Sequence, residues 1–174
     1  MNLTKKITII AIVLLSINTN LNAGTPHFLD FKYILNQSDA GKKAQTYLKK
    51  KLNDGIKNLQ SREKAIQEEE KKIIQQKKVI SAEEYKKKVT NLRNKVATLQ
   101  KERNSLLDNI AKQRSKARTE LLKNLNPIIK EYMAEKKIRM VVDKKSLLLA
   151  DQSLNITDEI VKRLNKKLKS IKLN

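Results

Sequence analysis

Residues 52–80, LNDGIKNLQSREKAIQEEEKKIIQQKKVI, decide the fold of this chain. Apolar side chains recur every seven residues in this charged stretch, at Leu52, Leu59, Ile66, Ile73 and Ile80. A repeat of seven places one narrow apolar stripe along a helix and leaves the rest of its surface to water. The stretch therefore predicts a long exposed helix, from about Ala44 to Ile80, rather than part of a globular core.

The second half of a coiled-coil seam is largely missing from the same stretch. A coiled coil needs two apolar positions in each heptad. Placed four residues after the first series, the second set would be Ile56, Glu63, Glu70 and Lys77, of which only the first is apolar. Gly55 also lies inside the helix, at a cost of about 1 kcal/mol relative to alanine. We therefore expect this helix to pack loosely on its partner and to bend.

The next segment predicts a second helix, from about Ala82 to Lys137. Ser81 and Glu84 form an S-x-x-E capping box at the point where the first repeat stops. Two apolar series follow, the second interrupted by Arg103: Tyr85, Leu92, Leu99 and Leu106, then Val89, Val96, Ile110 and Ala117, continued by Leu121, Leu125, Ile128 and Tyr132. Pro127 lies inside this pattern and predicts a kink or a break near Asn124. Because a short connection makes two helices antiparallel, residues 42–137 predict a hairpin about 60 Å long, with its turn near 79–83.

The two ends of the chain predict one small unit, residues 24–41 plus 138–174. Three short apolar stretches are typical of strands, at 26–31 (PHFLDF), 138–142 (IRMVV) and 147–150 (LLLA), and 143–146 (DKKS) would be a hairpin turn. Thr157 is expected to cap a last helix. The predicted fold is thus mostly α with a small β part, a long helical hairpin that projects from a β-rich head. A head this small, with exposed strand edges, favours association of several copies.

The first 23 residues have the pattern of a secretory signal peptide. Lys5 and Lys6 precede an apolar run of eleven residues, 7–17, and a polar stretch ends at Ala23, after which we expect cleavage. An uncleaved membrane anchor is the alternative reading. The chain has no cysteine, which excludes disulfides and thiolate metal sites. In a diderm bacterium the mature protein would lie in the periplasm.

No catalytic, cofactor-binding or metal-binding residue is predicted. The single histidine, His27, lies in a predicted strand, where a structural role is expected. Glu68, Glu69 and Glu70 form a run that is typical of a solvated helix face. With three glycines in the chain and no phosphate-binding loop, we expect a protein that is not an enzyme and works without nucleotide.

The charge is concentrated on the predicted hairpin. The chain holds 39 Lys and Arg against 18 Asp and Glu, and residues 42–80 and 81–137 carry 12 basic against 5 acidic and 15 against 7. Such charge keeps an exposed helix soluble, and it also attracts acidic partners in a salt-dependent way. Nucleic acid is the usual partner of strongly basic proteins. The signal-like N-terminus and the 3% aromatic content argue against it here.

Together these segments resemble the Skp/OmpH family of outer-membrane-protein chaperones. The resemblance is carried by residues 26–45 (PHFLDFKYILNQSDAGKKAQ) and 128–167 (IIKEYMAEKKIRMVVDKKSLLLADQSLNITDEIVKRLNKK). The segment VVDKKSLLLAD followed by NITDE is its most specific part, with Leu149 where the family commonly has an aromatic residue.

The resemblance implies a homotrimer whose hairpins enclose a cavity. It implies an ATP-independent holdase that binds unfolded outer-membrane β-barrel proteins in the periplasm, on the inner faces of the hairpin 42–137, without cofactors. Acidic lipids or lipopolysaccharide would be additional partners, and no nucleic acid is expected. Two other hypotheses remain, a structural coiled-coil protein of the envelope and a basic protein that binds lipopolysaccharide or nucleic acid.

Overall fold

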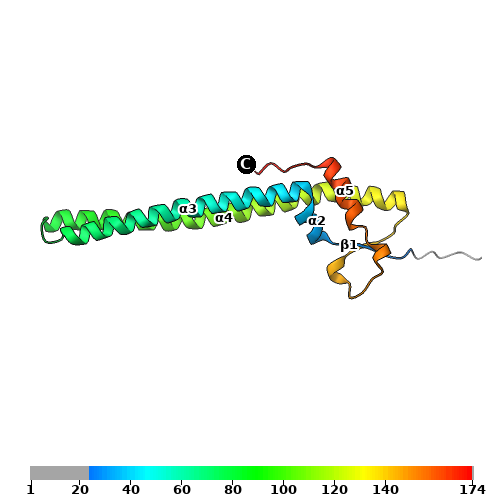
Figure 1. Cartoon of the computed structure of the whole chain (residues 1–174), viewed down its shortest axis with the longest axis horizontal. Helices are drawn as coiled ribbons and strands as arrows, with labels where there is room; N and C mark the ends of the chain where they lie inside the picture. Colours follow the sequence, from blue (N-terminus) through cyan, green and yellow to red (C-terminus); the bar gives the residue numbers. More distant parts are fainter. Residues whose placement is uncertain (1–23, 174) are drawn as a thin grey trace, which may run out of the picture.

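The computed structural model describes residues 24–173 and shows one long rod with a small folded base at one end (Figure 1). Helices α3 (Asp39–Gln76) and α4 (Ala82–Lys136) lie antiparallel and form the rod. The 38 residues of α3 span about 57 Å at 1.5 Å per residue. No helix among the described residues is long and apolar enough to cross a membrane. The predicted signal peptide, 1–23, lies outside the described residues.

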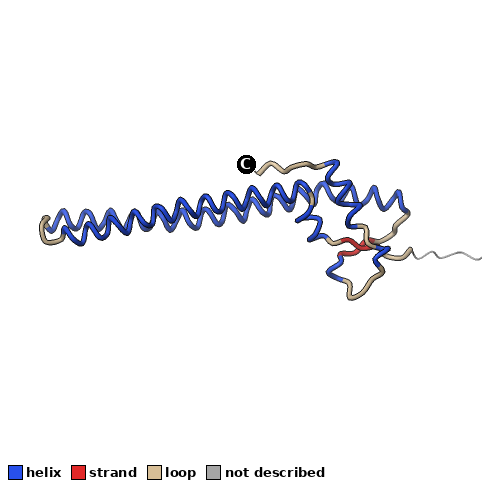
Figure 2. The backbone as a smooth tube through the Cα atoms, in the orientation of Figure 1, coloured by secondary structure: helices blue, strands red, loops and turns tan. Residues whose placement is uncertain are grey.

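The base is formed by segments from both ends of the chain. It contains strand β1 (His27–Leu29), helix α2 (Phe31–Gln37), strand β2 (Val141–Asp143), two single-turn 3₁₀ helices (Lys144–Ser146 and Gln152–Leu154) and helix α5 (Thr157–Lys167). Helices α2 and α5 pack on the end of α4 and the start of α3, and the two strands and the 3₁₀ turns lie beside them, away from the rod (Figure 2).

Both long helices begin directly after a capping serine, and one of the two, Ser81, was predicted to cap its helix. The hydroxyl oxygen of Ser38 accepts a hydrogen bond from the Gly41 N–H at 3.2 Å, and that of Ser81 accepts one from the Glu84 N–H at 3.1 Å. A side-chain acceptor at this position satisfies an amide that the helix itself leaves without a partner. The connection covers residues 77–81, slightly earlier than predicted, because the carbonyl of Gln76 already accepts from the N–H groups of Val79 and Ile80.

The second series of the seam lies three residues after the first, not four. Ile56 is 39% exposed, and Glu70 and Lys77 are exposed, so these three residues of the predicted second set do not face α4, whereas the fourth, Glu63, reaches Arg103 of α4 at 3.4 Å. The second series that the structure shows is polar, repeats every seven residues in both helices, and forms three contacts: Arg62 with Glu102, Glu69 with Lys95, and Gln76 with Lys88. The hairpin therefore combines an apolar stripe, with Leu59, Ile73 and Leu99 buried, and a parallel ladder of polar pairs.

The alternating signs in this polar ladder favour a single register. A slip of one heptad in one direction would place Arg62 opposite Lys95, and a slip in the other direction would place Glu69 opposite Glu102. Like charges in direct contact are destabilising. An apolar stripe alone discriminates poorly between such registers. The polar pairs therefore help to select the register of the two helices, although they contribute little to stability.

We expect the two ways of filling the seam to give different stabilities. Replacing both Arg62 and Glu102 by leucine should raise the free energy of unfolding by about 1 kcal/mol, because two half-buried charges become apolar contact. Replacing Glu63 and Glu70 by leucine should give no gain, because Glu70 is exposed and Glu63 is the partner of Arg103. Urea unfolding followed by circular dichroism measures both, and a larger gain in the second pair would contradict the register described here.

Gly55 allows the two helices to approach closely and does not interrupt α3. A Cβ atom at this position would lie 2.6 Å from Cδ2 of Leu106, so the leucine side chain packs over the glycine backbone. Gly55 was expected to weaken the helix. Instead, α3 continues unbroken through it, and Gly55 is a point of close contact between the two helices.

A kink or a break was predicted near Asn124; the break does not occur, and α4 continues through Pro127 to Lys136. Asn124, one turn earlier, donates its side-chain N–H to the Glu120 carbonyl at 2.8 Å. The flanking side chains Leu125 and Ile128 are each 1% exposed in the core of the base. Tertiary packing on both sides of the proline thus maintains the helix against the loss of one backbone hydrogen bond.

The strand pairing differs from the predicted hairpin. β1 and β2 pair in parallel, with His27 opposite Val141 and Leu29 opposite Asp143. The prediction of a strand at 147–150 is wrong, because these residues form an exposed loop after the 3₁₀ turn at 144–146. The described residues hold two strands of three residues each, so the β content is smaller than the β-rich head that was expected.

A single apolar cluster holds the base together. Ile34, Ile160 and Leu164 are completely buried, and α2, α4 and α5 each contribute to the cluster. Thr157 does not cap α5 as predicted; its hydroxyl oxygen accepts from the Asp30 N–H at 2.9 Å and so ties α5 to the segment after β1. Both its N–H and its hydroxyl donate to the side-chain oxygen of Asn155.

Candidate functional site

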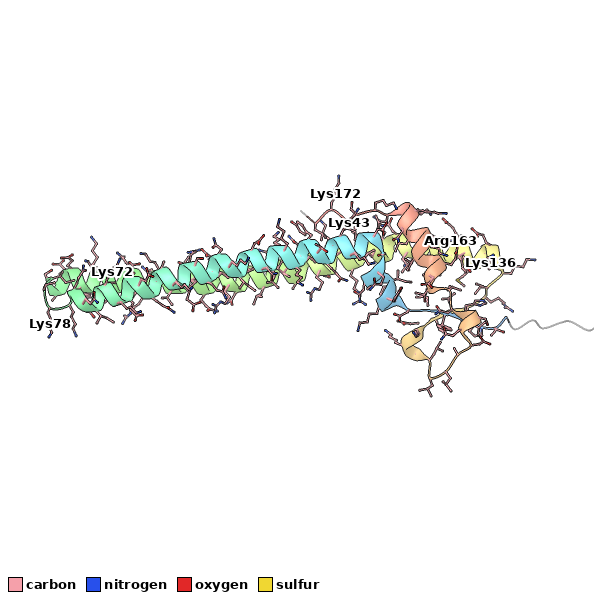
Figure 3. The ribbon with its side chains drawn as sticks, in the orientation of Figure 1. Lys43, Lys72, Lys78, Lys136, Arg163 and Lys172 are labelled. Atoms are coloured by element: carbon pink, nitrogen blue, oxygen red, sulfur yellow. The ribbon has the colours of Figure 1, made fainter. Side chains whose placement is uncertain are left out.

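The surface of the hairpin combines positive charge with isolated apolar side chains. Lysines extend from the rod along its length, from Lys43 near the base to Lys72 and Lys78 at the tip (Figure 3). Among them lie large apolar side chains that are at least half exposed: Ile74 at 60% exposure, Val79 at 79%, Val96 at 50% and Leu107 at 54%. Such scattered contacts allow many weak interactions with an apolar segment but no single deep pocket.

A groove of about 780 Å³ opens where the hairpin joins the base. Its apolar lining comes from three helices: Leu35 of α2, Leu48 and Leu52 of α3, and Ile110 and Leu121 of α4. Lys49, Arg114 and Arg118 supply positive charge to the same groove. The geometry suits an apolar segment with acidic neighbours.

A second apolar feature is the loop that was predicted to be a strand. Leu148 and Leu149 are 101% and 94% exposed, and Met140 beside β2 is 53% exposed. Contiguous exposed apolar side chains of this size typically mark an interaction surface. The run LLLA did not predict this exposure, because it is equally consistent with a buried strand.

Helix α5 is fastened to α4 by a group of charged side chains. The guanidinium of Arg163 donates to both carboxylate oxygens of Glu135, at 2.8 and 2.7 Å, and to Glu159 at 3.2 Å. It also lies 4.8 Å from the ring centre of Tyr132. The hydrogen bond from Arg163 lowers the pKa of Glu135, and the same bond raises the pKa of Arg163. One turn along, Lys167 contacts Glu131 at 3.0 Å.

The lowered pKa of Glu135 predicts a loss of stability in acid. Above the ordinary pKa of 4.5 the carboxylate is ionised in both states, and its contribution is complete. As the pH falls below this value the unfolded chain takes up the proton first, so the contribution is lost toward the folded-state pKa. Melting temperatures measured from about pH 6 to about pH 3 should therefore fall less steeply in Glu135→Gln than in the wild type. Glu68→Gln, on the exposed hairpin, is the control, and equal slopes for Glu135→Gln and the wild type would contradict the assignment.

His27 and the run of Glu68, Glu69 and Glu70 lie in different parts of the molecule, β1 in the base and α3 in the hairpin. His27 Nδ1 lies 3.1 Å from the Thr25 carbonyl oxygen, at the exposed start of β1. Glu69 faces Lys95 of α4, whereas Glu68 and Glu70 are exposed. Within residues 24–173, no three metal-ligating side chains gather in one place. Client binding on the inner faces of the hairpin, 42–137, which would line the cavity between copies, stays a prediction.

Comparison with known proteins adds a family and a fold. The OmpH family model, described as outer membrane protein (OmpH-like), matches residues 27–164. The structure of an OmpH-like protein from Caulobacter crescentus, described as a candidate outer membrane chaperone, superposes with a TM-score of 0.79 at 20% identity. The alignment covers 84% of this chain and 86% of that chain, which shows a shared fold. No curated protein sequence matches the chain. The family match spans most of the chain, and the protein therefore belongs to the family of OmpH-like outer membrane proteins.

Proposed function

We propose that this protein is an ATP-independent periplasmic chaperone that holds unfolded outer-membrane β-barrel proteins and prevents their aggregation. The observation that carries the proposal is the hairpin itself, a long basic rod with exposed apolar side chains dispersed along it. Membership of the OmpH-like family supports the same role. A holder of unfolded chains needs reach and many weak contacts, because contacts that are individually weak can be released without an energy source.

We further propose that the working form is a homotrimer. Residues 24–41 and 138–174 would form the unit through which the copies associate, and residues 42–137 would form the arm. The exposed pair Leu148 and Leu149 and the outer edge of β2 offer apolar surface and unpaired strand edge to a second copy. Three arms around one body would enclose a cavity for a client. The same proposal includes removal of residues 1–23 as a signal peptide and action in the periplasm.

An aggregation assay tests the holding activity. A urea-unfolded outer-membrane β-barrel protein is diluted into buffer with and without the mature protein, and light scattering is recorded. We expect scattering to be suppressed equally with and without ATP, and less effectively at high salt because the positive surface is screened. Unchanged scattering in the presence of the protein would reject the chaperone function and favour a structural role in the envelope.

A matched pair of variants connects the activity to the hairpin. Changing Ile74, Val96 and Leu107 to serine removes exposed apolar contacts, and we expect clearly weaker suppression of scattering. Changing the exposed polar residues Asn53, Gln67 and Gln75 to serine is the control and should leave suppression unchanged. All six side chains are exposed, so neither variant is expected to lose the fold.

A further inference from the structure

The last described residues, after α5, fold back onto the hairpin. After α5 the tail, residues 168–173, runs along the side of the rod toward its tip (Figure 1). Leu173 is 3% exposed and packs in an apolar cluster with Ala44, Leu48, Ile110 and Ala117, four residues that we call the root strip. Ile171 packs against the same cluster, while Lys169, Ser170 and Lys172 are exposed.

Apolar side-chain contacts are the main interactions that hold the tail against the hairpin. No backbone–backbone hydrogen bond joins residues 169–173 to the hairpin in the described chain. One ion pair, Lys169 with Asp39 at 3.3 Å, lies where the tail begins. The tail is therefore an extended segment with apolar side chains every two or three residues, seated on an apolar surface. These are the features that a segment of an unfolded protein would present.

The root strip has the properties of a binding surface. Ala44 and Ala117 are small, which leaves room for an inserted side chain between α3 and α4. All four strip residues also line the groove of about 780 Å³ described above, so the strip borders an open groove beside α2. Gln113 of α4, between Ile110 and Ala117 in the chain, holds the one buried side-chain oxygen without a hydrogen-bond partner among the described residues. A peptide N–H is a suitable donor for it.

We propose that the root strip binds extended apolar segments of unfolded polypeptides, and that the tail occupies it in cis and limits their access. The proposal rests on the proposed chaperone function. The matched family region ends at residue 164, so the tail lies beyond the part that this chain shares with the family model. An occupant tethered to its own site lowers the apparent affinity for a competitor by the fraction of time that the site is open.

Three variants test this control of access. A chain that ends at Lys167 keeps α5 and lacks the tail, Leu173→Lys keeps the tail and removes its buried contact, and Lys172→Ala is the control at an exposed position. The probe is a urea-unfolded outer-membrane β-barrel protein, and binding is followed by fluorescence anisotropy. If the tail occupies the strip nine-tenths of the time, affinity rises about tenfold in the first two variants and not in the control. Unchanged or weaker binding in Leu173→Lys would overturn the proposal.

A second measurement does not depend on the chaperone function. A peptide with the sequence of residues 168–174 is added at millimolar concentration to the shortened chain, and amide NMR shifts of Ala44 and Ala117 are recorded. We expect saturable shifts that are lost in Leu48→Ala and kept in Tyr47→Ala, whose side chain is 42% exposed. Absence of shifts would overturn the strip as a site. Shifts with no binding of unfolded protein by any variant would instead reject the proposed function.

Discussion

Gly41→Ala is expected to destabilise the protein severely, by about 3 kcal/mol or more. A Cβ atom at Gly41 would lie 1.9 Å from the carbonyl oxygen of Leu35 and 2.9 Å from the hydroxyl oxygen of Ser38. The first of these is backbone of α2, and the second is the cap of α3. Neither can move without opening the sharp turn between the two helices, so the base must rearrange to admit one methyl group.

The matched substitution Gly55→Ala separates this effect from helix propensity. Both glycines lie in α3, and alanine is favoured over glycine in a helix by about 1 kcal/mol. At Gly55 the obstacle is the outer end of the Leu106 side chain, which can turn toward solvent. We expect a change within about 1 kcal/mol in Gly55→Ala, measured by urea unfolding beside Gly41→Ala. Similar losses in both variants would show that the close contact at Gly41 is not the cause.

The hairpin could be predicted from the sequence because its signals are local. Ser38 and Ser81 are recognisable caps, and the seven-residue apolar repeat defines which face of each long helix is buried. The repeat did not show whether the second series of seam residues lies three or four residues after the first. Arg62, Glu69 and Gln76 have no apolar character, and only their partners on α4 identify them as seam positions.

The base was less predictable because its contacts join residues that are distant in sequence. β1 pairs with a strand more than a hundred residues away, and the tie between Thr157 and Asp30 spans 127 residues. Local propensity favoured a hairpin of 138–142 with 147–150, but pairing with β1 is the arrangement that forms. Pro127 likewise predicted a break that packing in the core prevents.

The candidate site could be predicted only in its general character. Charge counts placed a basic surface on the hairpin, and the lysines do extend along it. The groove at the root is lined by residues of three helices, and no sequence spacing joins Leu35 to Leu48 and Leu121. The position of the tail could not be inferred either, since Ile171 and Leu173 form too short a pattern to indicate what they pack against.

Replacing Leu148 and Leu149 together by aspartate is expected to convert the proposed trimer into monomers. Both side chains are almost completely exposed in the single chain, at 101% and 94%, so the change should leave the fold of each copy intact. If the two leucines are buried between copies, their loss removes about 3 to 6 kcal/mol from each contact. Association would weaken more than a hundredfold, and the introduced charges would add to the loss.

Native mass measurement at micromolar concentration detects the conversion, once the wild type has been shown to be a trimer. Val79→Asp is the control, because Val79 is also an exposed apolar residue, at 79%, but lies in the turn at the far end of the hairpin. The control should keep the wild-type mass. The aspartate pair should also lose most of its ability to suppress aggregation, because separate arms enclose no cavity. A variant that becomes monomeric yet protects fully would show that a single hairpin is sufficient, and the cavity would then have no part in holding a client.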